Sequence, residues 1–190
     1  MPNEPAATRP AVLLTGAPAS GKTTLGRMLA EALAAVLVDL DTVTAPLLEV
    51  VSTLVGVHDL DDSRLSGLTR DARYETVVAV AEENLRVGRP AVLIAPFTPE
   101  RLDLGARAAL EDRLRAAGGS PVLVWIRVSP ETVLSRLSAR AADRDESKLA
   151  DPRQYLAGLD LRAPVGTFIE VDGERPPPER LAQVLAALAV

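Results

Sequence analysis

The chain has 190 residues, is 47% apolar and carries a formal net charge of −5. This length is enough for one domain with a single core. The absence of cysteine excludes disulfides, thiolate catalysis and cysteine-ligated zinc, and the single histidine, His58, argues against a histidine-based metal site or a Ser-His-Asp triad. The acidic balance also argues against a broad nucleic-acid-binding surface, which needs an excess of basic residues.

The chain shows no sign of membrane insertion or export. No apolar run approaches the roughly 20 residues of a membrane span. The N-terminus lacks the charged start and apolar run of a secretory signal. We therefore expect a cytoplasmic protein without membrane association. Residues 1–10 hold three prolines and predict a flexible tail, and residues 11–190 predict one domain.

An apolar run over residues 11–15 predicts a buried first strand, and an apolar stripe at helical spacing predicts a helix over residues 21–34. Between them the chain has the pattern G-x-x-x-x-G-K-[ST] of a P-loop. Its amides form a nest for phosphate oxygens at a helix N-terminus. We expect ATP to contact Gly16, Ala17, Pro18, Ala19, Ser20, Gly21, Lys22, Thr23 and Thr24.

Three positions of this loop have separate expected roles. Gly16 lets the chain leave the strand in a conformation that a Cβ would disfavour. Lys22 is expected to bridge the β- and γ-phosphates, and the Thr23 hydroxyl is expected to ligate Mg²⁺.

Two carboxylates, Asp39 and Asp41, follow a predicted second strand over residues 35–38. On an extended segment, positions i and i+2 face the same way. The carboxyl end of a parallel strand is where open α/β sheets bind ligands. We expect one carboxylate to hold Mg²⁺ through water and the other to accept a hydroxyl proton. The alternative is that Asp41 or Thr42 caps a helix that continues to residue 50.

Residues 52–68 contain turn-forming and acidic residues, which predict a solvated loop with His58 at the surface. An apolar stripe then predicts a helix over residues 69–87. Arg70 and Arg73 lie three positions apart on one side of this helix. They are candidates to contact an anionic or hydroxylated substrate.

The alternative for these arginines is surface ion pairing. Asp71 and Glu75 lie on the same predicted helix and could supply the carboxylates. The sequence leaves both interpretations open.

The third predicted strand, residues 91–95, ends without an acid. Many P-loop proteins have an aspartate at this strand end that supports the Mg²⁺ shell, whereas Ile94 and Ala95 stand here. Mg²⁺ binding would then depend on Thr23 and Asp39. Phe97 and Thr98 follow the strand as candidate substrate-pocket residues, with Phe97 alternatively a core residue.

The second half of the chain predicts a helix over residues 104–117, a strand over 122–128 and a helix that starts at Pro130. Arg136, Arg140 and Arg144 lie four apart and share a helical face. A row of guanidinium groups suits a lid, about residues 136–152, that closes over transferring phosphates. The alternative is a solvated helix with internal Arg–Asp pairs.

A fifth strand over residues 165–172 and a last helix after Pro176 complete the chain. Strands that alternate with helices predict an α/β fold with one parallel sheet and helices on both faces.

The chain resembles the P-loop kinases of small molecules in the nucleoside-monophosphate-kinase-like group. In particular, it is similar to the AAA-type ATP-binding proteins that include zeta-toxin-like, chloramphenicol-phosphotransferase-like and polynucleotide-kinase-like members. The matching stretches are residues 16–24, 38–43, 92–98 and 136–149. The resemblance implies a three-layer P-loop NTPase fold with a helical lid and a five-stranded parallel sheet of order 2-3-1-4-5.

The resemblance also implies roles for individual residues. It implies that Asp41 activates the acceptor hydroxyl and that Asp39 helps to hold Mg²⁺. Arg140 and Arg144 match the lid arginines, and Arg136 and Arg140 would contact the nucleotide. The loop over residues 172–175 would lie near adenine.

The function that these features favour is ATP-dependent transfer of the γ-phosphate to a small-molecule hydroxyl acceptor. A zeta-toxin-like nucleotide-sugar kinase is one alternative. A non-catalytic ATP-binding switch or regulatory ATPase is another. The acceptor and the oligomeric state are left open by the sequence.

Overall fold

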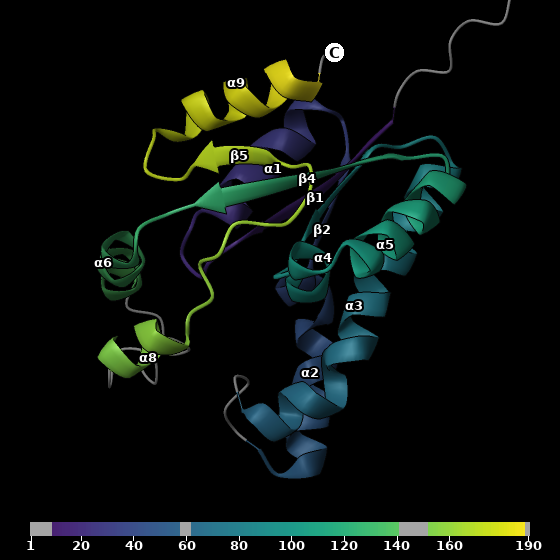
Figure 1. Ribbon diagram of the computed structural model, residues 1–190. Coiled ribbons are helices and arrows are strands. Elements are labelled where there is room, and N and C mark those ends of the chain that lie inside the picture. Colours follow the sequence, from purple (N-terminus) through teal and green to yellow (C-terminus); the bar gives the residue numbers. More distant parts are fainter. Residues whose placement is uncertain (1–8, 58–61, 141–151, 189–190) are drawn as a thin grey trace, which may run out of the picture.

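The computed structural model describes residues 9–57, 62–140 and 152–188, and its centre is a parallel sheet (Figure 1). The strand order is β2-β3-β1-β4-β5, and all neighbouring strands are parallel. This order confirms the predicted five-stranded P-loop sheet. The strands are β1 (Pro10–Gly16), β2 (Val36–Asp39), β3 (Ala91–Ile94), β4 (Ser120–Arg127) and β5 (Ile169–Asp172).

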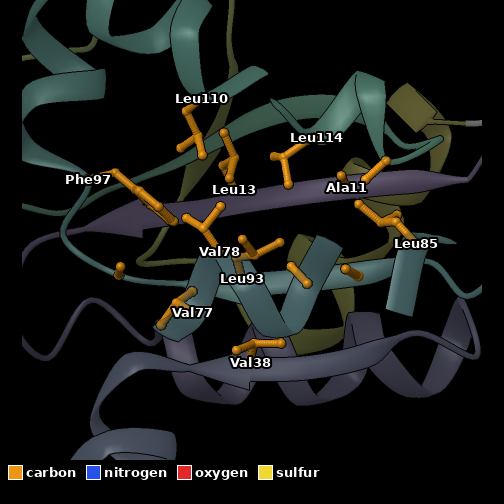
Figure 2. Packing of buried hydrophobic residues seen from close by; sticks show 14 of the residues in the cluster. Ala11, Leu13, Val38, Val77, Val78, Leu85, Leu93, Phe97, Leu110 and Leu114 are labelled. Carbon is orange, nitrogen blue, oxygen red and sulfur yellow. The ribbon is translucent and has the colours of Figure 1, made fainter. Parts of the chain in front are cut away.

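Helices cover both faces of the sheet, as predicted. The helices α3 (Ser63–Arg86) and α5 (Leu104–Ala116) cover one face, where Figure 2 shows Leu13 and Leu93 packed among residues of both helices. The helices α1 (Lys22–Ala32), α6 (Pro130–Arg140) and α9 (Pro177–Leu188) cover the other face (Figure 1). The central strands are apolar on both sides because each side faces a helical layer.

The strand register brings the carboxyl ends of the strands to one edge. Gly16 of β1 lies beside Ile126 of β4, and Asp39 of β2 lies beside Ile94 of β3. The P-loop, Asp39 and the connection after β3 therefore meet at this edge, where parallel sheets bind ligands.

The predicted loop over residues 52–68 was wrong at both ends. The helix α2 (Leu40–Val55) continues to Val55 and ends at Gly56, whose φ of 69° is left-handed. The helix α3 begins at Ser63 rather than at residue 69, because the Asp62 side chain caps it by accepting from the amides of Arg64 and Leu65. His58 lies outside the described residues.

Other element boundaries in the structure also differ from the predicted ones. The strand β5 starts at Ile169 rather than at residue 165, because the Val165 amide donates to the Arg101 carbonyl at 2.9 Å and not to a strand. A short helix α4 (Thr98–Leu102) follows β3, and α8 (Pro152–Gly158) precedes the connector to β5.

Most of the predicted lid lies outside the described residues. The helix α6 is described to Arg140, without that residue's side chain, and Arg144 belongs to the segment that is not described. Among the helices that are described, none combines the length and apolar content needed to cross a bilayer.

Candidate active site

The P-loop backbone depends on its two glycines. Gly16 has a φ of 152°, and a Cβ there would lie 2.8 Å from the Ile126 carbonyl oxygen. Gly21 has a φ of 96°, and a Cβ there would lie 2.6 Å from Nη1 of Arg180. Both conformations are ones that residues with a Cβ rarely adopt. The expectation that Gly16 leaves the strand in such a conformation is confirmed.

The P-loop leads into the N-terminus of α1, which is the positive end of the helix dipole. The N-cap of α1 is Gly21, which offers no side-chain acceptor, and the first turn contains no acid. Amides of a first helical turn have no intrahelical partner, and the helix dipole favours negative charge there. The Ser20 hydroxyl oxygen is also buried without a hydrogen-bond partner among the described residues. These features fit a bound phosphate group.

The Lys22 ammonium group lies over its own loop. Its Nζ donates to the carbonyl oxygens of Gly16 at 2.9 Å and Ala17 at 2.7 Å. The side chain is therefore held at the phosphate site rather than extended into solvent. This position is compatible with the predicted role of Lys22.

Two arginines contact carbonyl oxygens of the P-loop. The Arg136 guanidinium donates to the carbonyls of Ala19 and Ser20, both at 3.3 Å, and to Gly173 at 2.7 Å. Arg180 is only 5% exposed, and its Nη1 lies 3.5 Å from the Ser20 carbonyl oxygen. Burial, together with the nearby Arg136 charge, lowers the pKa of Arg180. Positive charge thus accumulates beneath the phosphate nest.

Sequence reasoning found one of these arginines and missed the other. Arg136 was predicted to contact the nucleotide, and the structure places it between the P-loop and the loop after β5, where adenine was expected. Arg180 received no prediction. The available signal was its position four residues before the buried Val184, on the core-facing side of α9.

Asp39 connects the P-loop to the start of α2. Its Oδ2 accepts from the Thr23 hydroxyl at 3.1 Å, and its Oδ1 accepts from the Asp41 amide at 3.1 Å. The predicted extended geometry of Asp39 and Asp41 was wrong, because Asp39 caps a helix that already begins at Leu40. The capping residue is therefore Asp39, not Asp41 or Thr42.

The Thr23–Asp39 pair fits a lightly coordinated Mg²⁺. In the described part of the chain, no three acidic, histidine or cysteine side chains gather as a metal cluster. Ala95 is buried at the end of β3, where no acid is available. Mg²⁺ commonly binds through one or two carboxylates together with waters and substrate phosphates, so one hydroxyl and one carboxylate are sufficient protein donors.

Asp41 is exposed in the first turn of α2 and is held by Arg73. The Arg73 Nη2 lies 3.0 Å from Oδ1 of Asp41, and its Nε donates to the Thr44 hydroxyl at 2.9 Å. The acids considered from the sequence, Asp71 and Glu75, are not its partners in this pair. Glu75 pairs with Arg113 at 2.7 Å instead. Arg73 therefore orients the candidate base.

A cavity of about 280 Å³ adjoins this pair, between α2, α3 and the connection after β3. Leu40, Arg73, Pro96 and Thr98 contribute to its walls, so Thr98 lies where it was expected. Such a volume is just below the roughly 300–1,000 Å³ that is typical of small-molecule sites.

Phe97 lies in the core, which was the alternative for this residue (Figure 2), between the cavity residues Pro96 and Thr98. Its φ of 44° is left-handed, and its amide donates to the Tyr74 hydroxyl at 3.1 Å. The two rings meet edge to face. Burial, with the Glu100 charge, raises the pKa of Tyr74 to about 12. The sequence marked Tyr74 only as a core residue, but its hydroxyl holds the chain at the pocket wall.

Solved structures share this architecture over nearly the whole chain. A gluconokinase from Sinorhizobium meliloti is 22% identical, with a TM-score of 0.57 and coverage of 95% of this chain and 92% of its own. A shikimate kinase from Aquifex aeolicus is 20% identical, with a TM-score of 0.53 and coverages of 94% and 96%. The APS kinase of Mycobacterium tuberculosis in complex with AMPPNP and APS is 17% identical, with a TM-score of 0.62 and coverages of 96% and 99%.

These likenesses show the fold. In sequence, the curated proteins give no significant match. The model of the AAA domain family matches residues 12–164, which include the P-loop, Asp39, Asp41 and the cavity walls. The chain therefore belongs to the AAA domain family and has a P-loop fold that kinases of small molecules share.

Proposed function

We propose that this protein transfers the γ-phosphate of ATP to a hydroxyl group of a small molecule. The observation that carries the proposal is the series of hydrogen bonds from Thr23 through Asp39 to Asp41. Through the Asp41 amide, this series holds the start of α2 beside the phosphate loop, and Arg73, which pairs with the Asp41 carboxylate, lines a small cavity. A protein that only bound ATP would need neither the base nor the cavity.

The nucleotide end of the site has a clear physical basis. The uncapped α1 N-terminus and the Lys22 ammonium group would bind the phosphates. Thr23 and Asp39 would hold Mg²⁺, which would neutralise negative charge on the transferring phosphate. Arg136 would keep the P-loop carbonyls in place while the phosphates bind.

At the acceptor end, Asp41 would take the proton from the attacking hydroxyl. Arg73 limits the positions of the Asp41 carboxylate through the 3.0 Å pair, so the base is already oriented before the acceptor arrives. Phosphoryl transfer requires little covalent chemistry from the protein, and positioning with charge stabilisation supplies most of the rate. The lid residues Arg140 and Arg144 would add to that charge stabilisation.

A phosphotransfer screen tests the proposal directly. Mg·ATP is incubated with panels of sugars, nucleosides, amino alcohols and antibiotics, and ADP release is compared with and without each acceptor. We expect at least one acceptor to stimulate ADP release. With that acceptor, Asp41→Asn should lower kcat about 100-fold or more, the usual contribution of a general base.

The control is Glu49→Gln, an exposed acid further along α2. It should leave kcat unchanged. If Asp41→Asn keeps the full rate, the assignment of the base is wrong. If no acceptor stimulates ADP release while ATP binding persists, the non-catalytic switch replaces the proposed kinase. Stimulation by a nucleotide sugar alone would instead support the zeta-toxin-like alternative.

A further inference from the structure

The cavity beside Asp41 contains a second cation, Arg70, that the proposed chemistry does not use. Arg70 and Ser66 complete its α3 wall, one helical turn apart. The wall that they form is polar, while Leu40 and Pro96 supply apolar surface. The residues that line the cavity include two arginines and no carboxylate.

The two arginines differ in their partners. The charge of Arg73 is already matched by Asp41, and its remaining Nε donates to Thr44. Arg70 lies with its guanidinium carbon 5.8 Å from the centre of the Tyr74 ring. No carboxylate of the described residues lies within ion-pair distance of Arg70.

The nearby acid Glu100 forms no ion pair with Arg70 in the described part of the chain. Glu100 interacts with the Arg70 charge over a longer distance, and burial raises the pKa of Glu100. One carboxylate oxygen of Glu100 is buried without a hydrogen-bond partner among the described residues. The cavity lining therefore presents a guanidinium group, that of Arg70, which has no ion-pair partner among the described residues.

We propose that the acceptor is a small hydroxy compound with an anionic group, a carboxylate or a phosphate, that binds Arg70. This inference rests on the proposed kinase function and specifies the class of its acceptor. A guanidinium group matches the oxygens of carboxylates and phosphates, whereas a neutral polyol would leave this charge unmatched.

The spacing on α3 limits the size of the acceptor. Residues three apart on a helix have Cβ atoms about 5–6 Å apart. The side chains of Arg70 and Arg73 line the same small cavity, so a small acceptor can reach Arg70 with its anionic group while its hydroxyl lies near the Asp41–Arg73 pair. A short hydroxy acid or sugar phosphate meets this condition and fits a cavity of about 280 Å³.

The test compares related acceptors with and without an anionic group. The matched pairs are D-gluconate with D-glucitol, D-glycerate with glycerol, and glycerol 3-phosphate with glycerol. Each compound is assayed for phosphotransfer and, separately, for binding by calorimetry in the presence of Mg·ADP. We expect the anionic member of at least one pair to be preferred by about 10- to 150-fold, the range expected for hydrogen bonds to charged groups. The carboxylate and phosphate pairs distinguish the two anions.

Arg70→Gln should reduce that preference by about tenfold or more. Arg64→Gln, an exposed arginine on the same helix outside the cavity lining, should leave it unchanged. The anion proposal is rejected if the neutral members are used or bound as well as the anionic ones. It is also rejected if Arg70→Gln preserves the preference.

The two proposals fail in different ways. Phosphotransfer to neutral acceptors alone rejects the anion and leaves the kinase function standing. Anion binding that depends on Arg70, with no phosphotransfer to any compound of the screen, supports the anion site and rejects the kinase function. An absence of anion preference in both assays, at concentrations up to about 10 mM, rejects the anion site.

Discussion

Asp39 combines a structural and a chemical role that two substitutions can separate. Asp39→Ala removes the cap of α2 and the acceptor of the Thr23 hydroxyl. An N-cap contributes about 1 kcal/mol, and a hydrogen bond contributes about 1 kcal/mol. The alanine variant should therefore lose about 2 kcal/mol of stability, which corresponds to a fall in Tm of about 4–8 °C for a chain of this length.

Asp39→Asn keeps the shape and a capping oxygen but removes the charge. Because asparagine is as good an N-cap as aspartate, its stability should stay within about 0.5 kcal/mol of the wild type. Its apparent affinity for Mg²⁺ should fall about 10- to 100-fold, as is typical when the surroundings of a metal site are altered.

The stability of these variants can be measured with a fluorescent side chain that the protein already contains. Trp125, the single tryptophan, is buried in β4, so its fluorescence should report urea unfolding of the central sheet. Mg²⁺ affinity is measured from the metal dependence of nucleotide binding. Equal stability of the alanine and asparagine variants would contradict the capping role. Wild-type Mg²⁺ affinity in Asp39→Asn would contradict the metal role.

Three further predictions follow from buried or linked side chains. Arg180→Met should raise stability by about 1 kcal/mol, because it removes a buried charge that has no ion-pair partner among the described residues, yet weaken ATP binding; urea unfolding and calorimetry measure the two effects. Tyr74→Phe should cost about 1–3 kcal/mol in urea unfolding, because the Phe97 amide loses its partner. The hydroxyl and amide of Ser129, together with a second hydroxyl, hold the pKa of Glu174 at about 2, below its ordinary 4.5. The Tm difference between wild type and Glu174→Gln should be full above pH 4.5 and disappear as the pH falls to about 2; a difference that did not change with pH would contradict this linkage.

The fold was largely predictable because its signals are local and repeated. The apolar run before residues 16–23 predicts β1, and the apolar stripe at helical spacing after them predicts α1. The strand order came from the resemblance, and the sheet confirms it. The errors lie where a single side chain decides a boundary. Asp39 starts α2 earlier than the predicted cap at Asp41 or Thr42 would, and Asp62 starts α3 earlier than its apolar stripe predicts.

The candidate site was predictable in part. The sequence selected Thr23 and Asp39, and the structure joins them by a hydrogen bond. It could not predict that Arg73 pairs with Asp41, because these residues are brought together only when α2 packs against α3. Arg180 was missed because a buried arginine is rare and its pattern is that of any amphipathic helix.

The arginine contacts around α6 and α4 have a mechanical consequence. Arg136, near the end of α6, is fastened to the P-loop carbonyls. Beyond α8, Asp160 pairs at 3.2 Å with Arg101 of α4, the short helix that begins at the cavity residue Thr98. Arg136 is thus fixed beside the nucleotide loop, and Asp160 is fixed beside the helix that leads from the acceptor cavity. A movement of the P-loop would therefore displace Arg136, and a movement of α4 would displace Asp160.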